Sequence, residues 1–346
     1  MSRKLLVTGG CGFIGSNFIR YVLNNHNDDV LNLDALTYAG NLENLNDISA
    51  NRRYRFVKGD ICNERVVNDI LKNGIDVILN FAAESHVDRS LYDPASFIKT
   101  NIVGTHTLLE LAREHKVRKF IQISTDEVYG SLPPNGYFTE NTPLSPNSPY
   151  SASKTSADLI AMAYYKTFNL PVTITRSSNN YGPYQFPEKL IPLFITNALA
   201  GKELPVYGDG LNVRDWLFVE DNCSAIYVVL EKGGAGEIYN IGSGNEKPNI
   251  EITKTILKLL DKNENLIKYI KDRPGHDRRY ALDFSKIKNE LGWTPKVPFK
   301  EGLEDTINWY RDNKDWVEKV KSGEYLKFYE QHYGMLDGKI KNKKSK

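Results

Sequence analysis

Hydrophobic positions in the first half of the chain alternate between two periods. Short, β-branched apolar runs predict strands at Lys4–Thr8, Val30–Asp34, Tyr54–Lys58, Asp76–Phe81, Lys119–Ser124 and Val172–Arg176. Longer segments between them have helical spacing, at Gly15–Asn24, Arg65–Lys72, Asn101–His115 and Tyr150–Phe168. Because the strands are apolar almost throughout and alternate with helices, we expect a doubly wound parallel α/β sheet that is covered on both faces.

The pattern changes after Arg176. Residues 177–214 are rich in Asn, Gly, Pro and Tyr, and irregular segments of this length are usually functional. Helices are expected at Leu190–Ala200, Glu220–Lys232, Asn249–Leu260, Ser285–Leu291 and Glu301–Asn313. We therefore expect a first domain over residues 1–178, with residues 214–242 packing back onto it. Residues 179–346 would form a smaller mixed α/β lobe, whose lysine-rich end, 339–346, is expected to fray.

Composition narrows the class of protein. The 346 residues include 45 Lys and Arg against 43 Asp and Glu, and this balance provides no general attraction to nucleic acid or an anionic membrane. No apolar run approaches the ~20 residues that cross a bilayer. Three scattered cysteines are too few for a disulfide framework, and no histidine has a metal-binding spacing. These features favour a soluble, cytoplasmic globular protein of α/β size without a metal.

A glycine-rich turn follows the first predicted strand. Gly9, Gly12 and Gly15 have the spacing of a turn that leads into a helix, where a pyrophosphate can approach the backbone and free N–H groups. Asp34 ends the second strand, where it can accept hydrogen bonds from a ribose diol and repel a 2′-phosphate. The combination predicts an NAD site rather than an NADP site. A glycine turn without a ligand is the alternative.

Other residues follow the carboxyl ends of later strands, where open α/β sheets bind their ligands. Asp60 and Ile61 follow the third strand and are placed near the adenine, whereas Ala82 and Ala83 follow the fourth and are placed beneath the pyrophosphate and ribose. Taken alone, either segment is equally consistent with a capping acid and tight packing.

Tyr150 and Lys154 lie four residues apart on one face of a predicted helix, after a Ser148 N-cap and Pro149. A neighbouring Lys⁺ and an oxidised nicotinamide would both favour the phenolate, which would make Tyr150 a general base for an alcohol. The spacing alone is common by chance. Downstream of a dinucleotide turn, it predicts hydride-transfer chemistry.

Thr125, Asp126 and Glu127 follow the fifth strand. The hydroxyl can bind the substrate oxygen whose proton Tyr150 removes. Two adjacent carboxyls offer an acid and a base for a second proton-transfer step that simple alcohol oxidation does not need. A solvated or helix-capping acidic turn is the alternative reading of the pair alone.

These motifs resemble the extended short-chain dehydrogenase/reductase family, in its branch acting on nucleotide sugars, and most closely the 4,6-dehydratases of that branch. The resemblance runs from Lys4 to about Asn313. The family members have a Rossmann-type fold. The motifs that carry the resemblance are the glycine turn, the Tyr150 to Lys154 spacing, Asp34–Asn41, Ala83–Arg89, Thr125–Gly130, Asn179–Pro192 and Leu291–Pro295.

The resemblance implies a redox cycle with an elimination inside it. Tyr150, aided by Thr125 and Lys154, takes the proton of the sugar 4-hydroxyl while NAD accepts the C4 hydride. Glu127 then removes the C5 proton and Asp126 protonates the departing 6-hydroxyl. The hydride returns to C6 and Glu127 can reprotonate C5, so a tightly held NAD is regenerated in each turn.

The resemblance also implies binding residues. The cofactor set is Gly9, Gly12, Phe13, Ile14, Gly15, Asp34, Leu36, Thr37, Asp60, Ile61, Phe81, Ala82, Ala83, Ser85, Thr100, Tyr150, Lys154 and Asn180. The substrate set is Ser85, His86, Thr125, Asn179, Glu188, Lys189, Leu190, Pro205, Tyr207, Arg214, Asn249, Arg273 and His276. Family members are commonly homodimers through a helix pair, here expected to be Asn101–His115 and Tyr150–Phe168.

Three rival functions remain open at this point. An epimerase or decarboxylase of the same family would share the hydride chemistry, but an epimerase needs no elimination acid and base. A 4,6-dehydratase acting on another nucleotide sugar would differ only in its nucleotide contacts. A non-catalytic NAD-binding protein would not need Tyr150 or Lys154, and both are present.

Overall fold

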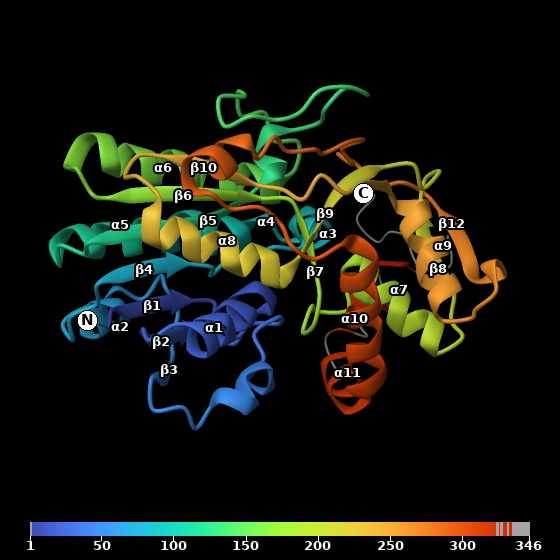
Figure 1. The fold of residues 1–346 in the computed structure, drawn as a ribbon, viewed down its shortest axis with the longest axis horizontal. Coiled ribbons are helices and arrows are strands. Elements are labelled where there is room, and N and C mark those ends of the chain that lie inside the picture. The colour runs from blue at the N-terminus through green and yellow to red at the C-terminus, as the bar shows by residue number, and fades with distance from the viewer. Residues whose placement is uncertain (1, 323–324, 326–327, 331, 334–346) are drawn as a thin grey trace, which may run out of the picture.

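A seven-stranded parallel sheet forms the larger part of the molecule (Figure 1). The computed structural model describes residues 2–322, 325, 328–330 and 332–333, so the tail 339–346 lies outside the described residues. The strand order is β3-β2-β1-β4-β5-β6-β10, which confirms the predicted doubly wound sheet. Its strands are β1 (Lys4–Thr8), β2 (Asp29–Asp34), β3 (Tyr54–Lys58), β4 (Val77–Asn80), β5 (Lys119–Thr125), β6 (Val172–Ser177) and β10 (Ile238–Ile241).

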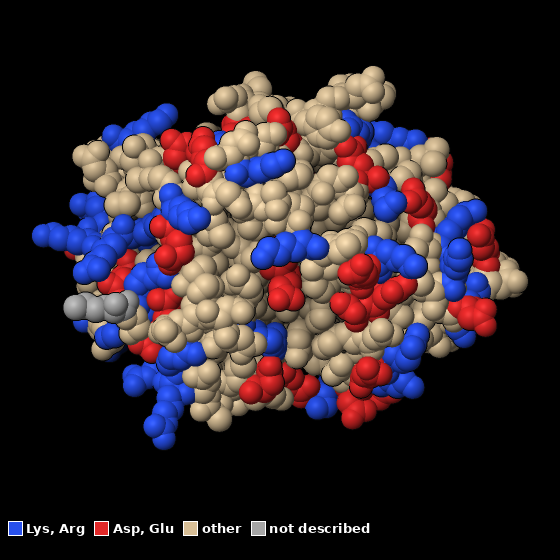
Figure 2. Space-filling view, in the orientation of Figure 1, with Lys and Arg blue, Asp and Glu red and all other residues tan. Residues whose placement is uncertain are grey.

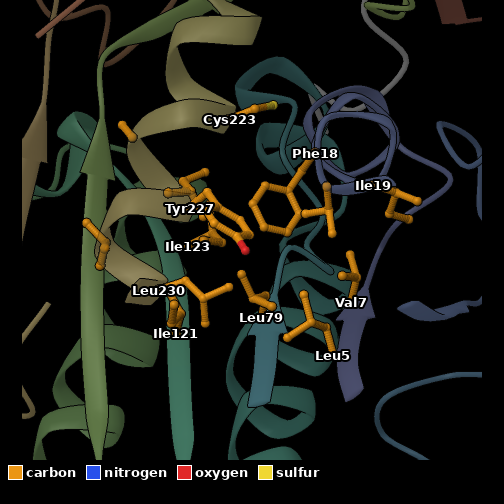
Figure 3. Close-up of a cluster of buried hydrophobic side chains, with 14 of the residues drawn as sticks. Leu5, Val7, Phe18, Ile19, Leu79, Ile121, Ile123, Cys223, Tyr227 and Leu230 are labelled. Atoms are coloured by element: carbon orange, nitrogen blue, oxygen red, sulfur yellow. The ribbon is translucent and has the colours of Figure 1, made fainter. Parts of the chain in front are cut away.

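Helices cover both faces of this sheet, because its strands are apolar on both sides. One face packs against α1 (Phe13–Asn25) and α8 (Val219–Lys232). The other packs against α2 (Glu64–Leu71), α5 (Thr105–Glu114) and α6 (Pro149–Phe168). In Figure 3, Phe18 of α1 and Tyr227 of α8 lie together above Leu79 of β4.

The smaller lobe has its own core around Tyr181 and Tyr310, both completely buried. Three strands form a mixed sheet, in which β9 pairs antiparallel with β11 and parallel with β7. A separate two-stranded sheet pairs β8 parallel with β12. The strands are β7 (Asn179–Tyr181), β8 (Leu204–Tyr207), β9 (Val213–Phe218), β11 (Glu246–Pro248) and β12 (Ile267–Ile270). The helices are α7 (Leu190–Leu199), α9 (Asn249–Leu259), α10 (Phe299–Asp312) and α11 (Lys314–Val320).

The segment after β9 returns to the large sheet. Helix α8 packs on α1, and β10 pairs with β6 as the last strand of the sheet. Short helical turns make the remaining connections: η1 (Leu42–Ile48), α3 (Val87–Tyr92), α4 (Pro94–Phe97), η2 (Ile98–Gly104), η3 (Asp126–Tyr129), η4 (Glu264–Leu266) and η5 (Ile287–Leu291).

Two expectations from the sequence are corrected by the fold. The predicted helix Asn101–His115 is not regular throughout, because its first turn belongs to the π-helical segment η2. Residues 177–214, expected to be irregular around one helix, contain β7 and β8. Strands of three or four residues are too short to show a period of two.

The helix that carries Tyr150 and Lys154 begins as predicted. The Ser148 hydroxyl accepts a hydrogen bond from the Ser151 N–H, and the Ser151 hydroxyl accepts one from the Ser148 N–H. Pro149 occupies the first turn, where a missing N–H costs nothing. This capping box fixes where α6 starts and therefore which side chains face β5.

Charges of both signs are interspersed over the face shown in Figure 2. Within the described part of the chain, no helix combines the length and the apolar character needed to span a membrane.

Candidate active site

The carboxyl ends of the central strands open into one cavity of about 300 Å³. Asp34 ends β2, Phe81 follows β4, Thr125 ends β5 and Ser177 ends β6, and all four line the cavity. Strand β1 lies between β2 and β4, so the chain order reverses at this point of the sheet. Such a switch point is where doubly wound sheets bind nucleotides.

The glycine turn has no room for side chains at two of its positions. Gly9 has φ +68°, and a Cβ there would lie 2.7 Å from backbone atoms of Ala82. A Cβ on Gly15 would lie 2.4 Å from the Gly9 carbonyl oxygen. Gly12 is the N-cap of α1, which has no side-chain cap and no acid in its first turn. The first N–H groups of α1 therefore remain available to an anion in the cavity.

Asp34 connects the glycine turn to the loop after β2. Its carboxylate accepts hydrogen bonds from the N–H groups of Cys11 and Leu36, each at 2.8 Å. Burial raises the pKa of Asp34, and the two backbone hydrogen bonds offset only part of that rise. The carboxylate thus holds two cavity-lining segments together. Leu36 itself does not line the cavity.

Asp126 and Glu127 begin a short helical turn directly after β5. The Thr125 hydroxyl accepts a hydrogen bond from the Glu127 N–H at 3.3 Å and donates one to Asp126 Oδ1 at 3.2 Å. Asp126 is 2% exposed, and its Oδ2 has no hydrogen-bond partner among the described residues. One carboxyl oxygen is therefore free to meet a ligand.

Burial and neighbouring charges act differently on the pKa values of Asp126 and Glu127. Burial and, next, the Glu127 charge together raise the pKa of Asp126 to about 8. Burial also raises the pKa of Glu127, but Lys189, Arg273 and Arg214 lower it. At neutral pH the pair therefore holds a proton on Asp126, next to a carboxylate that nearby cations favour.

Tyr150 and Lys154 reach the same cavity from α6. Burial raises the pKa of the Tyr150 phenol, the Glu127 charge adds to this, and a hydrogen bond with Thr125 opposes it. Burial lowers the pKa of Lys154 to about 8, against the attraction of Asp158. The Lys154 ammonium donates to the Ile123 carbonyl at 2.6 Å. In the protein alone, the phenol is thus held protonated.

The cavity presents polar atoms that the protein leaves without partners. Among the described residues, six of its buried side-chain oxygens have no hydrogen-bond partner: Ser124 Oγ, Asp126 Oδ2, Ser178 Oγ, Asn179 Oδ1, Asn180 Oδ1 and Gln185 Oε1. Buried polar atoms are normally paired, so these point to a polar ligand. Together with the glycine turn and Asp34, the lining fits an NAD molecule with a sugar beside it.

The cavity brings together most of the residues expected at the site. Those that line it are Gly9, Gly12, Phe13, Ile14, Gly15, Asp34, Thr37, Asp60, Ile61, Phe81, Ala82, Ala83, Ser85, Thr100, Thr125, Asp126, Glu127, Tyr150, Lys154, Asn179, Asn180, Glu188 and Lys189. Those expected at the site that do not line it are Leu36, His86, Leu190, Pro205, Tyr207, Arg214, Asn249, Arg273 and His276.

Two arginines of the second group are committed to partners within the protein. Arg273 pairs with Asp88 at 2.5 Å, and Arg214 donates to the carbonyls of Val213 and Asp277 at 2.7 and 2.9 Å. Both still lower the pKa of Glu127, so they lie within electrostatic range of the acid pair. Asn249 Oδ1 is buried without a partner among the described residues.

Several lining residues were not predicted from the sequence: Leu33, Ala35, Ala39, Gly40, Gly59, Glu84, Ile123, Ser124, Ser177, Ser178, Gln185 and Phe186. Ser124 and Ser177 could have been found, since they lie at the carboxyl ends of two predicted strands. Gln185 and Phe186 come from an irregular loop and carry no such signal.

Comparison with known proteins identifies the family to which this chain belongs. The model of the GDP-mannose 4,6 dehydratase family matches residues 6–306, and the chain belongs to this family. The finding confirms the resemblance to the nucleotide-sugar branch of the short-chain dehydrogenases/reductases.

Individual relatives of the chain have a more specific name than the family as a whole. The dTDP-glucose 4,6-dehydratase of Shigella flexneri is 52% identical, in an alignment that covers 95% of this chain and 99% of that protein. The dTDP-glucose 4,6-dehydratase of Streptomyces venezuelae, solved with NAD bound, has a TM-score of 0.90 and 51% identity over 92% of this chain and 100% of that one. The enzyme of Bacillus anthracis, also solved with NAD, has a TM-score of 0.87 and 55% identity with the same coverage.

Within the described residues, no three or more His, Cys, Asp and Glu side chains gather in a group that would hold a metal ion.

The raised pKa of Asp126 predicts a stability cost at neutral pH. The folded state binds this proton more tightly than an unfolded chain, whose Asp titrates near ~3.9, so stability falls as pH rises from about 4 to about 8. Asp126→Asn removes this loss. Its advantage in unfolding free energy over the parent should grow by up to about 1.4 kcal/mol per pH unit in that range.

Denaturant unfolding at a series of pH values measures this advantage. Asp209→Asn is the control, because the pKa of the exposed Asp209 is lowered to about 2 by its bond to Arg278. The control should show no gain that grows with pH. A pH-independent difference for Asp126→Asn would contradict the assignment of the proton.

Proposed function

We propose that this protein is an NAD-dependent dTDP-glucose 4,6-dehydratase, a hydro-lyase that forms dTDP-4-keto-6-deoxyglucose for deoxysugar synthesis. The observation that carries the proposal is the adjacent pair of the buried Asp126 and the half-buried Glu127, beside Tyr150 in one cavity. The dTDP-glucose 4,6-dehydratases that share about half of its residues support the choice of substrate.

The first step is oxidation at C4. Tyr150 takes the proton of the 4-hydroxyl, and the Thr125 hydroxyl, which lowers the pKa of Tyr150 against the effect of burial, orients the same oxygen. When bound, NAD would supply the hydride acceptor for C4 and the hydride donor for C6, and its positive ring would favour the phenolate. As C6 regains the hydride, Glu127 returns a proton to C5. Lys154 is fixed by the Ile123 carbonyl, so its charge stays close to this chemistry.

The second step is loss of water across C5 and C6. A 4-ketone acidifies the C5 proton, so a carboxylate becomes strong enough to remove it. Glu127 is the base, since Lys189, Arg273 and Arg214 favour its charged form. Asp126 holds the proton that the departing 6-hydroxyl needs, because its pKa of about 8 keeps it protonated at neutral pH.

The acid pair also argues against the rival functions. An epimerase returns hydrogen to C4 and has no use for a protonated carboxyl beside a carboxylate. A protein that only binds NAD would have no reason to bear the cost of burying Asp126 next to a second, half-buried acid. A 4,6-dehydratase for another nucleotide sugar stays the second candidate, because its chemistry would need the same residues.

The remaining assignments form part of the same proposal. Residues 1–178, joined by 214–242, hold NAD and the hydride chemistry, and most of the rest shapes the sugar-nucleotide pocket. Lys189 and Arg214 supply positive charge for a diphosphate. The protein works in the cytoplasm.

A panel of nucleotide sugars tests the substrate. The purified protein should convert dTDP-glucose to a 4-keto-6-deoxy product without added reductant, and UDP-glucose, CDP-glucose and GDP-mannose at least about tenfold more slowly. Formation of the 4-keto product is followed by its absorbance in base and by mass spectrometry. Turnover of only another nucleotide sugar, or of none, would overturn the substrate assignment.

Glu127→Gln separates oxidation from elimination. Without its base, the variant should still oxidise C4 slowly but should not exchange the C5 proton, and product formation should fall by about a thousandfold or more. Deuterium incorporation at C5 in D2O, measured by NMR, is the readout. Glu140→Gln, outside the cavity lining, is the matched control and should retain labelling. Unchanged labelling in Glu127→Gln would refute the role of Glu127.

A homodimer is the last part of the proposal. Large apolar side chains are exposed on α3, η2 and α6, at Leu91, Tyr92, Ile98, Val103, Leu159 and Phe168. Such a surface favours association with a second copy.

Leu159→Glu should therefore yield a monomer, since the charge would be buried in the helix pair. Light scattering after size exclusion reports the mass. Leu211→Glu changes an equally apolar exposed side chain in the smaller lobe and should remain a dimer. A monomeric parent, or a dimeric Leu159→Glu, would count against this interface.

A further inference from the structure

Tyr38 connects two loops that line opposite parts of the cavity. It lies in the loop after β2, next to Thr37 and Ala39, which line the cavity. Its hydroxyl donates a hydrogen bond of 2.9 Å to Glu188 Oε1, which belongs to the loop before α7. This one side-chain hydrogen bond therefore joins two loops whose residues lie 150 positions apart in the sequence.

Glu188 is shared with a third element. Arg89, on α3, donates to the second carboxylate oxygen of Glu188 at 3.0 Å. The guanidinium carbon of Arg89 also lies 4.0 Å from the centroid of the Tyr38 ring, a cation–π distance. Glu188 is 8% exposed, so both of its oxygens are engaged in a site largely screened from water. Charge-assisted bonds in such surroundings are among the stronger ones.

An aromatic contact adds to this bridge. The Tyr38 and Phe186 rings form a T-shaped pair with their centroids 5.7 Å apart, and Phe186 lines the cavity together with Gln185. Ala39 and Gly40 line it from the side of Tyr38. A ligand between the two loops is thus enclosed by a contact that must open before the loops can separate.

We propose that Tyr38 is a positioning residue which, with Glu188 and Arg89, latches the two loops together and retains NAD between turnovers. This inference rests on the proposed function, because a dehydratase regenerates its cofactor in each cycle and has no need to exchange it. The latch connects the loop beyond Asp34, which is assigned to the cofactor, with the loop that carries Glu188, which is assigned to the sugar.

Tyr38→Phe tests the latch with the smallest change. It keeps the ring that contacts Arg89 and Phe186 but removes the hydroxyl that Glu188 accepts. NAD should leave the purified variant about tenfold faster than the parent. The rate is measured by rapid dilution and capture of the released NAD with an excess of a coupled dehydrogenase. The variant should also lose activity during gel filtration and regain it when NAD is added.

Tyr137→Phe is the matched control, since Tyr137 is 58% exposed and does not line the cavity. It should release NAD at the parent's rate. Thermal denaturation of both variants without NAD should give the parent's midpoint within about 2 °C, which separates cofactor release from general destabilisation.

The outcomes distinguish the latch from the proposed function. A parent that retains NAD and a Tyr38→Phe variant that releases it equally slowly would overturn the latch and leave the enzyme assignment intact. Faster release with a midpoint lowered by many degrees would also count against it, since unfolding would explain the loss. A parent that binds no NAD would overturn the proposed function itself.

Discussion

Two neighbouring carboxyl groups lie at the end of β5, one buried and one half-buried, and the chemistry of the site depends on how far each is withdrawn from water. Water would stabilise both charges, whereas the buried site lets only one form cheaply. The proton remains on Asp126, because cations near Glu127 favour the charge there. Sequence neighbours with almost the same ordinary pKa thereby become an acid and a base.

The rest of the fold maintains this burial and brings reactants to it. Parallel strands end at one edge, so the glycine turn after β1, the acid pair after β5 and the serines after β6 share one cavity. The capped start of α6 directs Tyr150 and Lys154 to the same place. Gly9 and Gly15 permit the close approach of α1 to the sheet, which leaves its free N–H groups facing the cavity.

Much of this arrangement could be predicted from the sequence, because it follows from local patterns. The apolar runs predicted the strands of the large sheet apart from β10, and their carboxyl ends located the Thr125 to Glu127 segment. The smaller lobe could not be predicted in the same way, since strands such as β7 and β11 have three residues each. Contacts between distant segments, such as Arg273 with Asp88 or Tyr38 with Glu188, arise only when the lobe folds over the sheet.

The central claim is that Asp126 keeps its proton at neutral pH while Glu127 does not. Infrared difference spectroscopy of the parent against Asp126→Asn reads this proton directly, through the stretching band of a protonated carboxyl group. The band should be present at pH 7 and disappear with a midpoint near pH 8, as expected from the pKa of Asp126. A parent that shows no such band at pH 7, or one that Asp126→Asn leaves unchanged, would contradict the account.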